Sequence, residues 1–348
     1  MKTVIKHTRA AILNKQSRPL IIDEIELPEK LHKGQILVKM KYSGICGSQL
    51  GEIDGVKGKD NYLPHLLGHE AIAKVVQTGT GVKKVKKGDK VLLHWMPSNG
   101  IDAKTAIYKW KNKKLNSGKI TTFSNYSIVS ENRVSKINKF KNDLDLLLLG
   151  CTASTAIGSV KKLCKIKKHQ TAVVAGCGPI GLYLIKYLNY LNIKKIISID
   201  INKKKLELSK KYGATDIILN SKKLQKKIPI KLMKDTDYFF ECTGNSKIIS
   251  SGYESLKTNG TIILIGVPHY KSKVKINTLG INLGKKLLGS KGGKFNPSKD
   301  LINFSKLVSL KKLSSKNFIL RRIKLDKINK IFSEMRQNKL LGKAIIEF

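Results

Sequence analysis

The sequence has few cysteines, and no two of them form a C-x-x-C pair. There are five in 348 residues, an odd number spread far apart: Cys46, Cys151, Cys164, Cys177 and Cys242. Disulfide frameworks are typical of small secreted proteins with an even set of cysteines. The pattern therefore excludes a disulfide scaffold and favours the reduced thiols of a cytosolic enzyme, some of which could bind metal.

Long hydrophobic runs are also missing. No apolar stretch approaches the ~20 residues that a membrane helix needs. The N-terminal stretch is basic but alternates like a strand, without the apolar centre of a secretory signal. We expect a cytoplasmic protein that does not engage membranes, and a length of 348 residues predicts two domains with ample core.

Arginine is scarce, although the formal net charge is +44. Only six of the 68 basic residues are arginine, and the lysines are spread over every segment. Base recognition relies on bidentate arginine, so the charge points to a compositional bias of the source more than to a nucleic-acid partner. It can still steer anionic substrates. A non-catalytic, basic nucleic-acid-binding protein is the alternative outside the enzymes.

The two halves of the chain differ in their hydrophobic pattern. Up to about residue 150, short alternating strands are separated by glycine turns, which predicts a β-rich domain. From about residue 153, apolar β-branched runs alternate with helical patterns, as in a parallel sheet covered on both faces. The fold class is α/β. The expected strands are 171–176, 194–200, 216–220, 237–244 and 261–267; the expected helices are 179–191, 202–213 and 246–260; the expected final strand is 343–348.

A glycine-rich turn follows the first of these strands and opens a helix. Its G-x-G-x-x-G spacing comprises Gly176, Gly178 and Gly181, with Pro179 and Ile180 between the last two. Such a turn lets the backbone approach a pyrophosphate, and the helix N-terminus offers free N–H groups to it. About 20 residues further on, Asp200 ends the next strand, where an acid binds ribose hydroxyls and repels a 2′-phosphate. The pattern predicts a dinucleotide site that prefers NAD. As an alternative, Asp200 merely caps the next helix.

Three residues from distant segments have side chains suited to zinc. Cys46 follows an alternating stretch over 36–40 that predicts a half-buried strand running out into a glycine-rich loop; His69 follows Gly68, and Cys151 follows another glycine. Two thiolates and an imidazole suit Zn²⁺, and three protein ligands leave a fourth position open, as a catalytic zinc requires. Each residue also has a structural alternative as a buried thiol or core histidine, and spacing alone does not decide.

Several motifs occur in an order that resembles the zinc-dependent medium-chain alcohol dehydrogenases. They include GICGSQL, LLGHEAIAKV, GCTASTAIGSV, VVAGCGPIGL, FECTGN and KGGKFNPSKD. The resemblance covers the whole chain and is close to the branch of glutathione-dependent formaldehyde and liver-type alcohol dehydrogenases. It implies a GroES-like β-rich catalytic domain built from residues 1–152 and 296–348. A Rossmann doubly wound domain that binds NAD is implied for residues 153–295.

The resemblance also implies roles for single residues. The catalytic zinc, one per subunit, would be held by Cys46, His69 and Cys151, with Glu70 behind it as an alternate ligand. Ser48 would hydrogen-bond the substrate hydroxyl and start a proton relay. For the coenzyme, Thr155 would lie near the nicotinamide, Asp200 and Lys205 would hold the adenosine ribose, and Lys343 would be a basic contact.

The sequence departs from this family in four places. Residues 94–120 hold no cysteine, whereas relatives often have a lobe there with a structural zinc; the segment has Trp95, Tyr108 and Trp110. Those aromatics either bind a sugar or phosphate group or repack a lobe that lost its metal. The other three departures are Gly47 in place of a basic pyrophosphate contact, Gly51 in place of a relay histidine, and Gln49 in place of an acid that braces the ligand histidine.

The function implied is a zinc-dependent NAD(H) alcohol dehydrogenase. Its substrate would be a primary or secondary alcohol, its aldehyde or ketone, or a hydroxymethyl adduct. A dehydrogenase of polyols or of sugars, phosphorylated ones included, is the alternative within the family. Zinc-free reductases of activated alkenes are disfavoured because all three ligands are present. A homodimer or homotetramer is expected from the resemblance.

Overall fold

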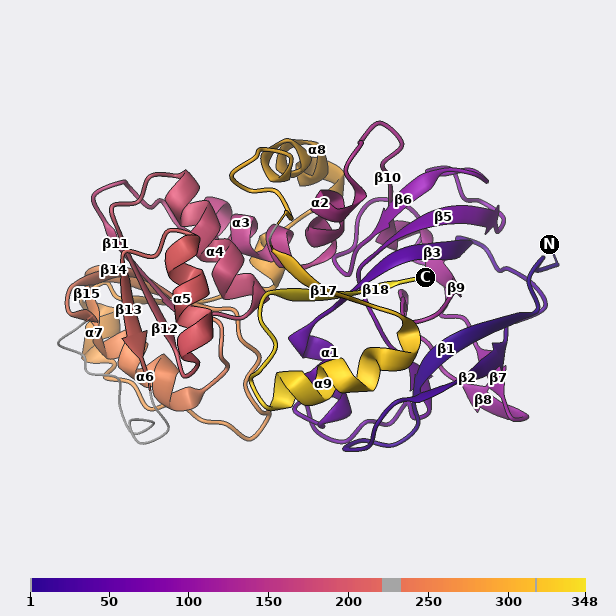
Figure 1. Cartoon of the computed structure of the whole chain (residues 1–348), viewed down its shortest axis with the longest axis horizontal. Helices are drawn as coiled ribbons and strands as arrows, with labels where there is room; N and C mark the ends of the chain where they lie inside the picture. The colour runs from indigo at the N-terminus through magenta and orange to yellow at the C-terminus, as the bar shows by residue number, and fades with distance from the viewer. Residues whose placement is uncertain (1, 221–232, 317) are drawn as a thin grey trace. The chain divides into compact units, whose positions relative to one another are not determined.

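The computed structural model describes residues 2–220, 233–316 and 318–348 (Figure 1). The chain divides into two compact units, each described by itself below. The first comprises Met1–Cys151, Asn296–Ser309 and Ser314–Phe348, and the second Thr152–Phe295 and Leu310–Leu313. The first unit therefore uses both ends of the chain.

The first unit is built on two largely antiparallel sheets. The five-stranded sheet has the order β4-β1-β2-β7-β8, and the seven-stranded sheet has the order β10-β6-β5-β3-β18-β17 with β9 also paired to β3. The strands of the first are β1 (His7–Leu13), β2 (Ile21–Glu26), β4 (His65–Leu66), β7 (Tyr108–Trp110) and β8 (Lys113–Leu115). Those of the second are β3 (Gln35–Ile45), β5 (Ala71–Thr78), β6 (Lys90–Leu93), β9 (Tyr126–Ser130), β10 (Val134–Lys136), β17 (Ile319–Ile323) and β18 (Lys343–Glu347).

The helices of this unit are short and follow or flank the strands. They are α1 (Gly47–Ile53), α2 (Asp143–Leu147), α8 (Pro297–Val308) and α9 (Ile328–Arg336). Between α1, α9 and the strands lies a core that includes Ile45, Ile53, Phe123, Phe332 and Ile346. The expected half-buried strand over 36–40 is part of the longer β3, whose residues from Gln35 to Val38 are all buried. Both faces are covered up to Val38, where the half-buried prediction was wrong, whereas Lys39 beyond it is exposed and Met40 is buried, as the alternation predicts.

Strand β3 leads directly to Cys46. Its first half pairs with β9 and its second half, from Tyr42 to Ile45, pairs with β18. Cys46 then begins α1 as its N-cap, so the glycine-rich stretch after it is a short helix and not the expected loop. The helix forms there because Gln49 at its third position reaches back to the Cys46 backbone, as in a capping box.

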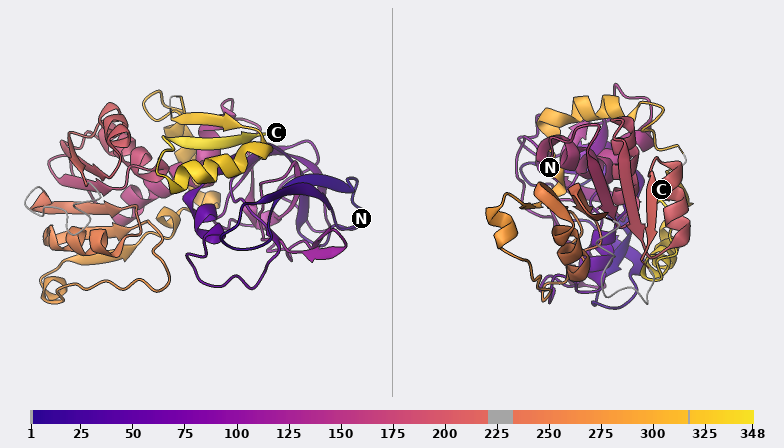
Figure 2. Two further views of the ribbon diagram at one scale, coloured as in Figure 1. Left: turned by 60° about the horizontal axis from the view of Figure 1, so that its bottom comes forward. Right: turned by 90° about the vertical axis from the view of Figure 1, so that its left-hand side faces the viewer.

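The second unit is a six-stranded parallel sheet of the order β13-β12-β11-β14-β15-β16. Its crossovers run outward from β11 in one direction through α4 and α5 and in the other through α6, which places helices on both faces; Figure 2 shows helices on either side of these strands. The strands are β11 (Thr171–Ala175), β12 (Lys195–Asp200), β13 (Asp216–Leu219), β14 (Thr236–Glu241), β15 (Leu256–Leu264) and β16 (Lys286–Gly289). The helices are α3 (Thr152–Leu163), α4 (Pro179–Tyr190), α5 (Lys203–Lys211), α6 (Ser246–Glu254) and α7 (Leu279–Asn282).

This arrangement confirms the predicted α/β class, with one correction. The helix expected over 246–260 ends at Glu254, and β15 has already begun at Leu256, beside Thr236. Ser255 is the C-cap of the helix, and its hydroxyl donates to the Gly252 carbonyl. The strand order reverses between β11 and β14, which is where open parallel sheets bind ligands.

The segment 94–120, which has no cysteine, is fixed to the rest of the first unit by aromatic packing and hydrogen bonds. Tyr108 and Trp110 lie in the core of the five-stranded sheet, and the indole of Trp110 donates to Asp23 at 2.8 Å. Lys84 donates from its ammonium to the Ser98 hydroxyl and to the carbonyls of Asn99 and Val134, at 2.6 to 2.8 Å. The burial of Tyr108 and Trp110 in this core favours a lobe repacked around aromatics over one that binds a sugar or phosphate group.

Glu131 completes the attachment of this segment. Its carboxylate accepts the backbone N–H groups of Lys83, Lys84 and Ile101. One carboxylate and one ammonium thus tie the start of the segment to the chain around residue 84 and to the end of β9.

By length and composition, no single helix among the described residues could cross a membrane. One bent pair, Asp143–Gly150 followed by Thr152–Leu163, passes that test only when its two parts are joined across a 63° break.

His94, in the same segment, predicts a loss of stability in acid. It is fully buried, its Nδ1–H donates to the Met96 carbonyl, and its Nε2 accepts from Ser135. Burial lowers the pKa of His94 from 6.5 to about 3. Between these values the unfolded chain binds a proton that the folded chain does not, so the free energy of unfolding should fall by ~1.4 kcal/mol per pH unit as pH drops from about 6 to 4.

The measurement is urea unfolding from pH 7 to pH 4, in the presence of a chelator, for the unaltered protein and His94→Asn. Asparagine keeps a donor near Met96 but does not titrate. The free energy of unfolding of His94→Asn should therefore change less with pH than that of the unaltered protein, by ~1.4 kcal/mol per pH unit. Equal pH dependence of the two proteins would show that His94 is not the group responsible.

Candidate functional site

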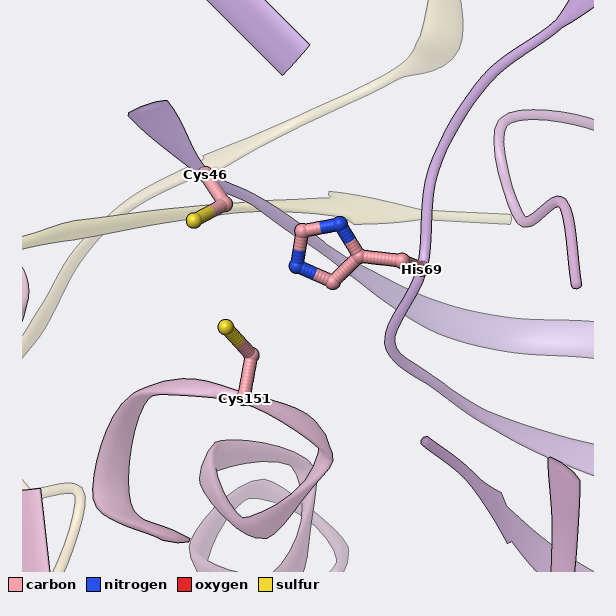
Figure 3. Close-up of side chains that lie close together, drawn as sticks. All are labelled: Cys46, His69 and Cys151. Atoms are coloured by element: carbon pink, nitrogen blue, oxygen red, sulfur yellow. The ribbon is translucent and has the colours of Figure 1, made fainter. Parts of the chain in front are cut away.

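Cys46, His69 and Cys151 come together within the first unit. Their candidate ligand atoms, two Sγ and one imidazole nitrogen, all lie within 4.8 Å of one another (Figure 3). Cys46 begins α1 where β3 ends, His69 precedes β5, and Cys151 follows the turn that carries Gly150. Three segments far apart in sequence thus meet at one point.

The donor set fits a zinc ion. His69 Nε2 is buried and has no hydrogen-bond partner among the described residues. Figure 3 shows one edge of the His69 ring facing both sulfurs, with the three side chains surrounding a common centre. An unsatisfied buried nitrogen beside two thiols is costly unless a ligand completes it, and two sulfurs with one imidazole are suited to Zn²⁺.

A hydrogen bond between the two thiols shifts their pKa values in opposite directions. A hydrogen bond from Cys151 holds the pKa of Cys46 well below its ordinary value, against the opposing effect of burial, and His69 adds to the lowering. The same hydrogen bond, together with burial, raises the pKa of Cys151. The thiolate is the form of cysteine that binds metal, and the lowered pKa of Cys46 favours that form.

Glu70 lies beside this cluster and is paired with Lys343. Both side chains are fully buried, and the Lys343 ammonium contacts Glu70 Oε1. Burial raises the pKa of Glu70, against the opposing charges of Lys343 and His69. For Lys343, burial alone would lower the pKa, but Glu70 and the two cysteines outweigh it. Glu70 is not among the atoms gathered within 4.8 Å, and the predicted roles of both residues stay predictions.

Ser48 and Gln49 follow Cys46 on α1 and approach the same imidazole. Ser48 Oγ is 3.4 Å from His69 Nδ1, and the Gln49 amide nitrogen is closer to that atom. Gln49 is 1% exposed, and its oxygen accepts the Cys46 backbone N–H at 2.9 Å. The structure thus brings Ser48 to the cluster, while its role in a proton relay stays a prediction.

Glu52 was not singled out from the sequence. It lies one helical turn after Ser48, so the two side chains share one face of α1. Burial raises the pKa of Glu52, and the largest opposing effects come from Lys57, His69 and His65. The i, i+4 spacing from Ser48 is the signal that could have found it.

In the second unit, the glycine-rich turn has the geometry that its spacing predicted. Gly176 has φ of +93°, a conformation that favours glycine. A Cβ on Gly181 would meet the Gly176 carbonyl oxygen at 1.9 Å, while one on Gly178 would meet nothing within 4 Å. The space beside Gly178 is thus open at the N-terminus of α4, where Pro179 and Ile180 begin the helix. Such a helix end accommodates phosphates.

Asp200 is at the end of β12, beside this turn. Its carboxylate accepts the N–H of Cys177 at 2.7 Å and that of Asn202 at 2.9 Å. The capping alternative fails, because Asn202 and not Asp200 is the N-cap of α5. Lys205 is buried on that helix, and burial lowers the pKa of Lys205 against the attraction of Asp200. Thr155 is buried on α3.

Known proteins match both parts of the chain. The family described as zinc-binding dehydrogenase matches residues 179–309, and the alcohol dehydrogenase GroES-like domain matches residues 32–139. An S-(hydroxymethyl)glutathione dehydrogenase of Escherichia coli is 29% identical over 369 residues, covering 97% of this chain and 99% of the relative.

Solved structures share the fold over the whole length. Benzyl alcohol dehydrogenase from Acinetobacter calcoaceticus is similar with a TM-score of 0.84 at 23% identity, covering 99% of this chain and all of the other. A short chain alcohol dehydrogenase from Escherichia coli CFT073, in complex with NADH, has a TM-score of 0.79 at 20% identity, with 99% and 100% covered.

The buried Glu70–Lys343 pair predicts a strong dependence of each partner on the other. Lys343→Met should lower the free energy of unfolding by ~3–5 kcal/mol, because it leaves Glu70 buried without its cation. Glu70→Gln should also destabilise, and the double variant should lose much less than the sum. Urea unfolding of the unaltered protein, the two single variants and the double variant, all stripped of metal, measures this double-mutant cycle. Additive losses would mean that the pair is not coupled.

Proposed function

Because this chain belongs to the zinc-binding medium-chain alcohol dehydrogenase family, an oxidoreductase family acting on CH–OH groups, we propose that it interconverts alcohols and their aldehydes or ketones with NAD as coenzyme. The observation that carries this proposal is the set of three ligand atoms within 4.8 Å, centred on an unpartnered imidazole nitrogen. In the proposal, Cys46, His69 and Cys151 hold one zinc per chain.

A zinc bound there would act as a Lewis acid, lowering the pKa of a hydroxyl placed beside it. Ser48 would accept the hydroxyl proton and pass it on. Gly51, two residues after Gln49, has no side chain to continue the relay, so the proton would leave through coenzyme hydroxyls and water. Bound NAD would supply the acceptor for the hydride of the alcohol carbon, and the products would be the carbonyl compound, NADH and one proton.

The coenzyme is proposed to bind the second unit. Its pyrophosphate would lie beside Gly178 at the start of α4, with Asp200 on the adenosine ribose. A carboxylate there repels a 2′-phosphate, which favours NAD over NADP. Lys205 and Thr155 are the further contacts proposed for ribose and nicotinamide, and Lys343 remains the proposed basic contact from the C-terminal strand.

Glu52 favours a polyol or sugar as the second candidate substrate. Its carboxyl shares a helix face with Ser48, and burial and neighbouring charges, not hydrogen bonds, set the direction of its pKa. A carboxylate can accept the hydrogen bond of a second hydroxyl, which a simple alcohol does not have. A simple alcohol has no second hydroxyl to place against it.

The test combines a substrate panel with one substitution. Zinc-loaded protein should reduce NAD with at least one member of a panel of simple alcohols, vicinal diols, polyols, sugar phosphates and S-(hydroxymethyl)glutathione. Cys46→Ser should remove one zinc per chain, measured by elemental analysis, and lower turnover by at least a hundredfold while NADH binding stays intact.

Cys164→Ser is the matched control, because Cys164 is a buried thiol outside the cluster. Its zinc content and turnover should equal those of the unaltered protein. Turnover that survives Cys46→Ser would refute the zinc mechanism. Turnover confined to diols and polyols would favour the second candidate.

A further inference from the structure

Gln49 connects two atoms of the candidate zinc centre. Its carbonyl oxygen accepts the backbone N–H of Cys46 at 2.9 Å, and its amide nitrogen lies against Nδ1 of His69. The residue is 1% exposed, so water does not replace either contact. Both neighbours of this one amide are residues proposed to bind the metal.

The two ends of the amide are not equivalent. The Cys46 N–H can only donate, so the Gln49 oxygen must face it, and the NH₂ group then faces His69. An amide NH₂ only donates, so this arrangement suits an Nδ1 that carries no proton. The arrangement in the structure is therefore complementary to one protonation pattern of the ring.

Metal binding demands the other pattern. A neutral histidine that binds metal through Nε2 keeps its single proton on Nδ1, and that N–H needs an acceptor. The Gln49 oxygen has two lone pairs, but in this rotamer it reaches the Cys46 N–H, whereas the amide nitrogen lies against His69 Nδ1. A proton on Nδ1 would therefore face a second donor. If the amide turns to serve His69, its NH₂ faces the Cys46 N–H instead.

Ser48 is a poor alternative acceptor for a proton on His69 Nδ1. Ser48 Oγ, the other group near Nδ1, is 3.4 Å away, at the outer limit of a hydrogen bond. Accepting from His69 would also use one of the two lone pairs of the hydroxyl that the proposed function assigns to the substrate. Glu70, which follows His69, directs Oε1 to Lys343.

We infer that Gln49 is a positioning residue that holds the zinc site in its metal-free arrangement, so that loading the metal sacrifices one buried hydrogen bond and the ion binds weakly and exchangeably. The inference rests on the proposed function, because it takes Cys46, His69 and Cys151 as the zinc ligands. A carboxylate of the same shape would have an oxygen for each donor. Gln49→Glu should therefore bind zinc ~10- to 100-fold more tightly than the unaltered protein.

The experiment measures zinc affinity by competition with a chromophoric chelator at pH 7.5, for the unaltered protein and three variants. Gln49→Glu supplies the second acceptor. Gln49→Met keeps the length of the side chain but removes both contacts, and it should bind zinc no more tightly than the unaltered protein. Gly47→Asp adds a negative charge next to Cys46 at a position where a Cβ meets nothing within 4 Å. It controls for simple charge attraction.

A second measurement follows the two protons directly, by hydrogen exchange in NMR of zinc-loaded, ¹⁵N-labelled protein. In the unaltered protein, zinc loading should expose either the Cys46 amide proton or the His69 Nδ1 proton to faster exchange. In Gln49→Glu both protons should stay protected. Slow exchange of both in the loaded, unaltered protein would overturn the inference even if the glutamate variant failed to fold.

The affinity data also separate this inference from the proposed function. Suppose that the unaltered protein binds one zinc and oxidises alcohols. The inference alone would be refuted if Gln49→Glu bound zinc no more tightly than the unaltered protein, or no more tightly than Gly47→Asp. Failure of the unaltered protein and of Gln49→Glu to bind zinc at all would refute both.

Discussion

The fully buried ion pair of Glu70 and Lys343 fixes the first unit around its candidate metal centre. Glu70 immediately follows His69, and Lys343 begins β18, which pairs with the part of β3 that leads to Cys46. A buried charge without its partner is strongly destabilising, so the pair holds β18 in register beside the end of β3 that leads to Cys46. Gly44 and Gly150 make room for this carboxylate, since a Cβ on either would meet the Glu70 side chain at 2.4 to 2.5 Å. Those glycines lie two residues before Cys46 and one before Cys151.

The candidate centre is thus positioned by buried polar contacts and not by hydrophobic packing alone. Gln49 caps α1 at Cys46 and reaches His69, and Glu70 with Lys343 lies behind them. Ligand geometry in metal sites depends on such surrounding partners. The consequence is that substitutions around the cluster act on metal affinity and on folding together, which is why a chelated reference state is needed to separate them.

The sequence predicted the parallel sheet and the glycine-rich turn well, because both rest on local patterns. Apolar runs alternating with helical segments specify β11 to β15. Gly176, Gly178 and Gly181, placed between a strand and a helix, are typical of a dinucleotide-binding turn. Joining Cys46, His69 and Cys151 required resemblance to a family, since no local pattern brings together three segments so far apart. The partner of Glu70 lies 273 residues away in sequence, and the two contacts of Gln49 depend on one rotamer. The helix expected to reach residue 260 ended early because tertiary pairing of Leu256 with Thr236 overrode a continuous polar pattern.

The abundance of lysine also has a structural side. Lys84 donates to three oxygens around residues 98–134, Lys90 joins Asp143 and the Phe140 carbonyl, and Lys119 binds the Ala103 carbonyl. An ammonium offers three donors and can gather carbonyls from separate segments. The region 94–120 has no cysteine to hold a metal. There, Lys84 and Glu131 connect separate segments through their hydrogen bonds. Part of the +44 charge is therefore committed to internal contacts, and total charge overstates what the surface offers to an anionic partner.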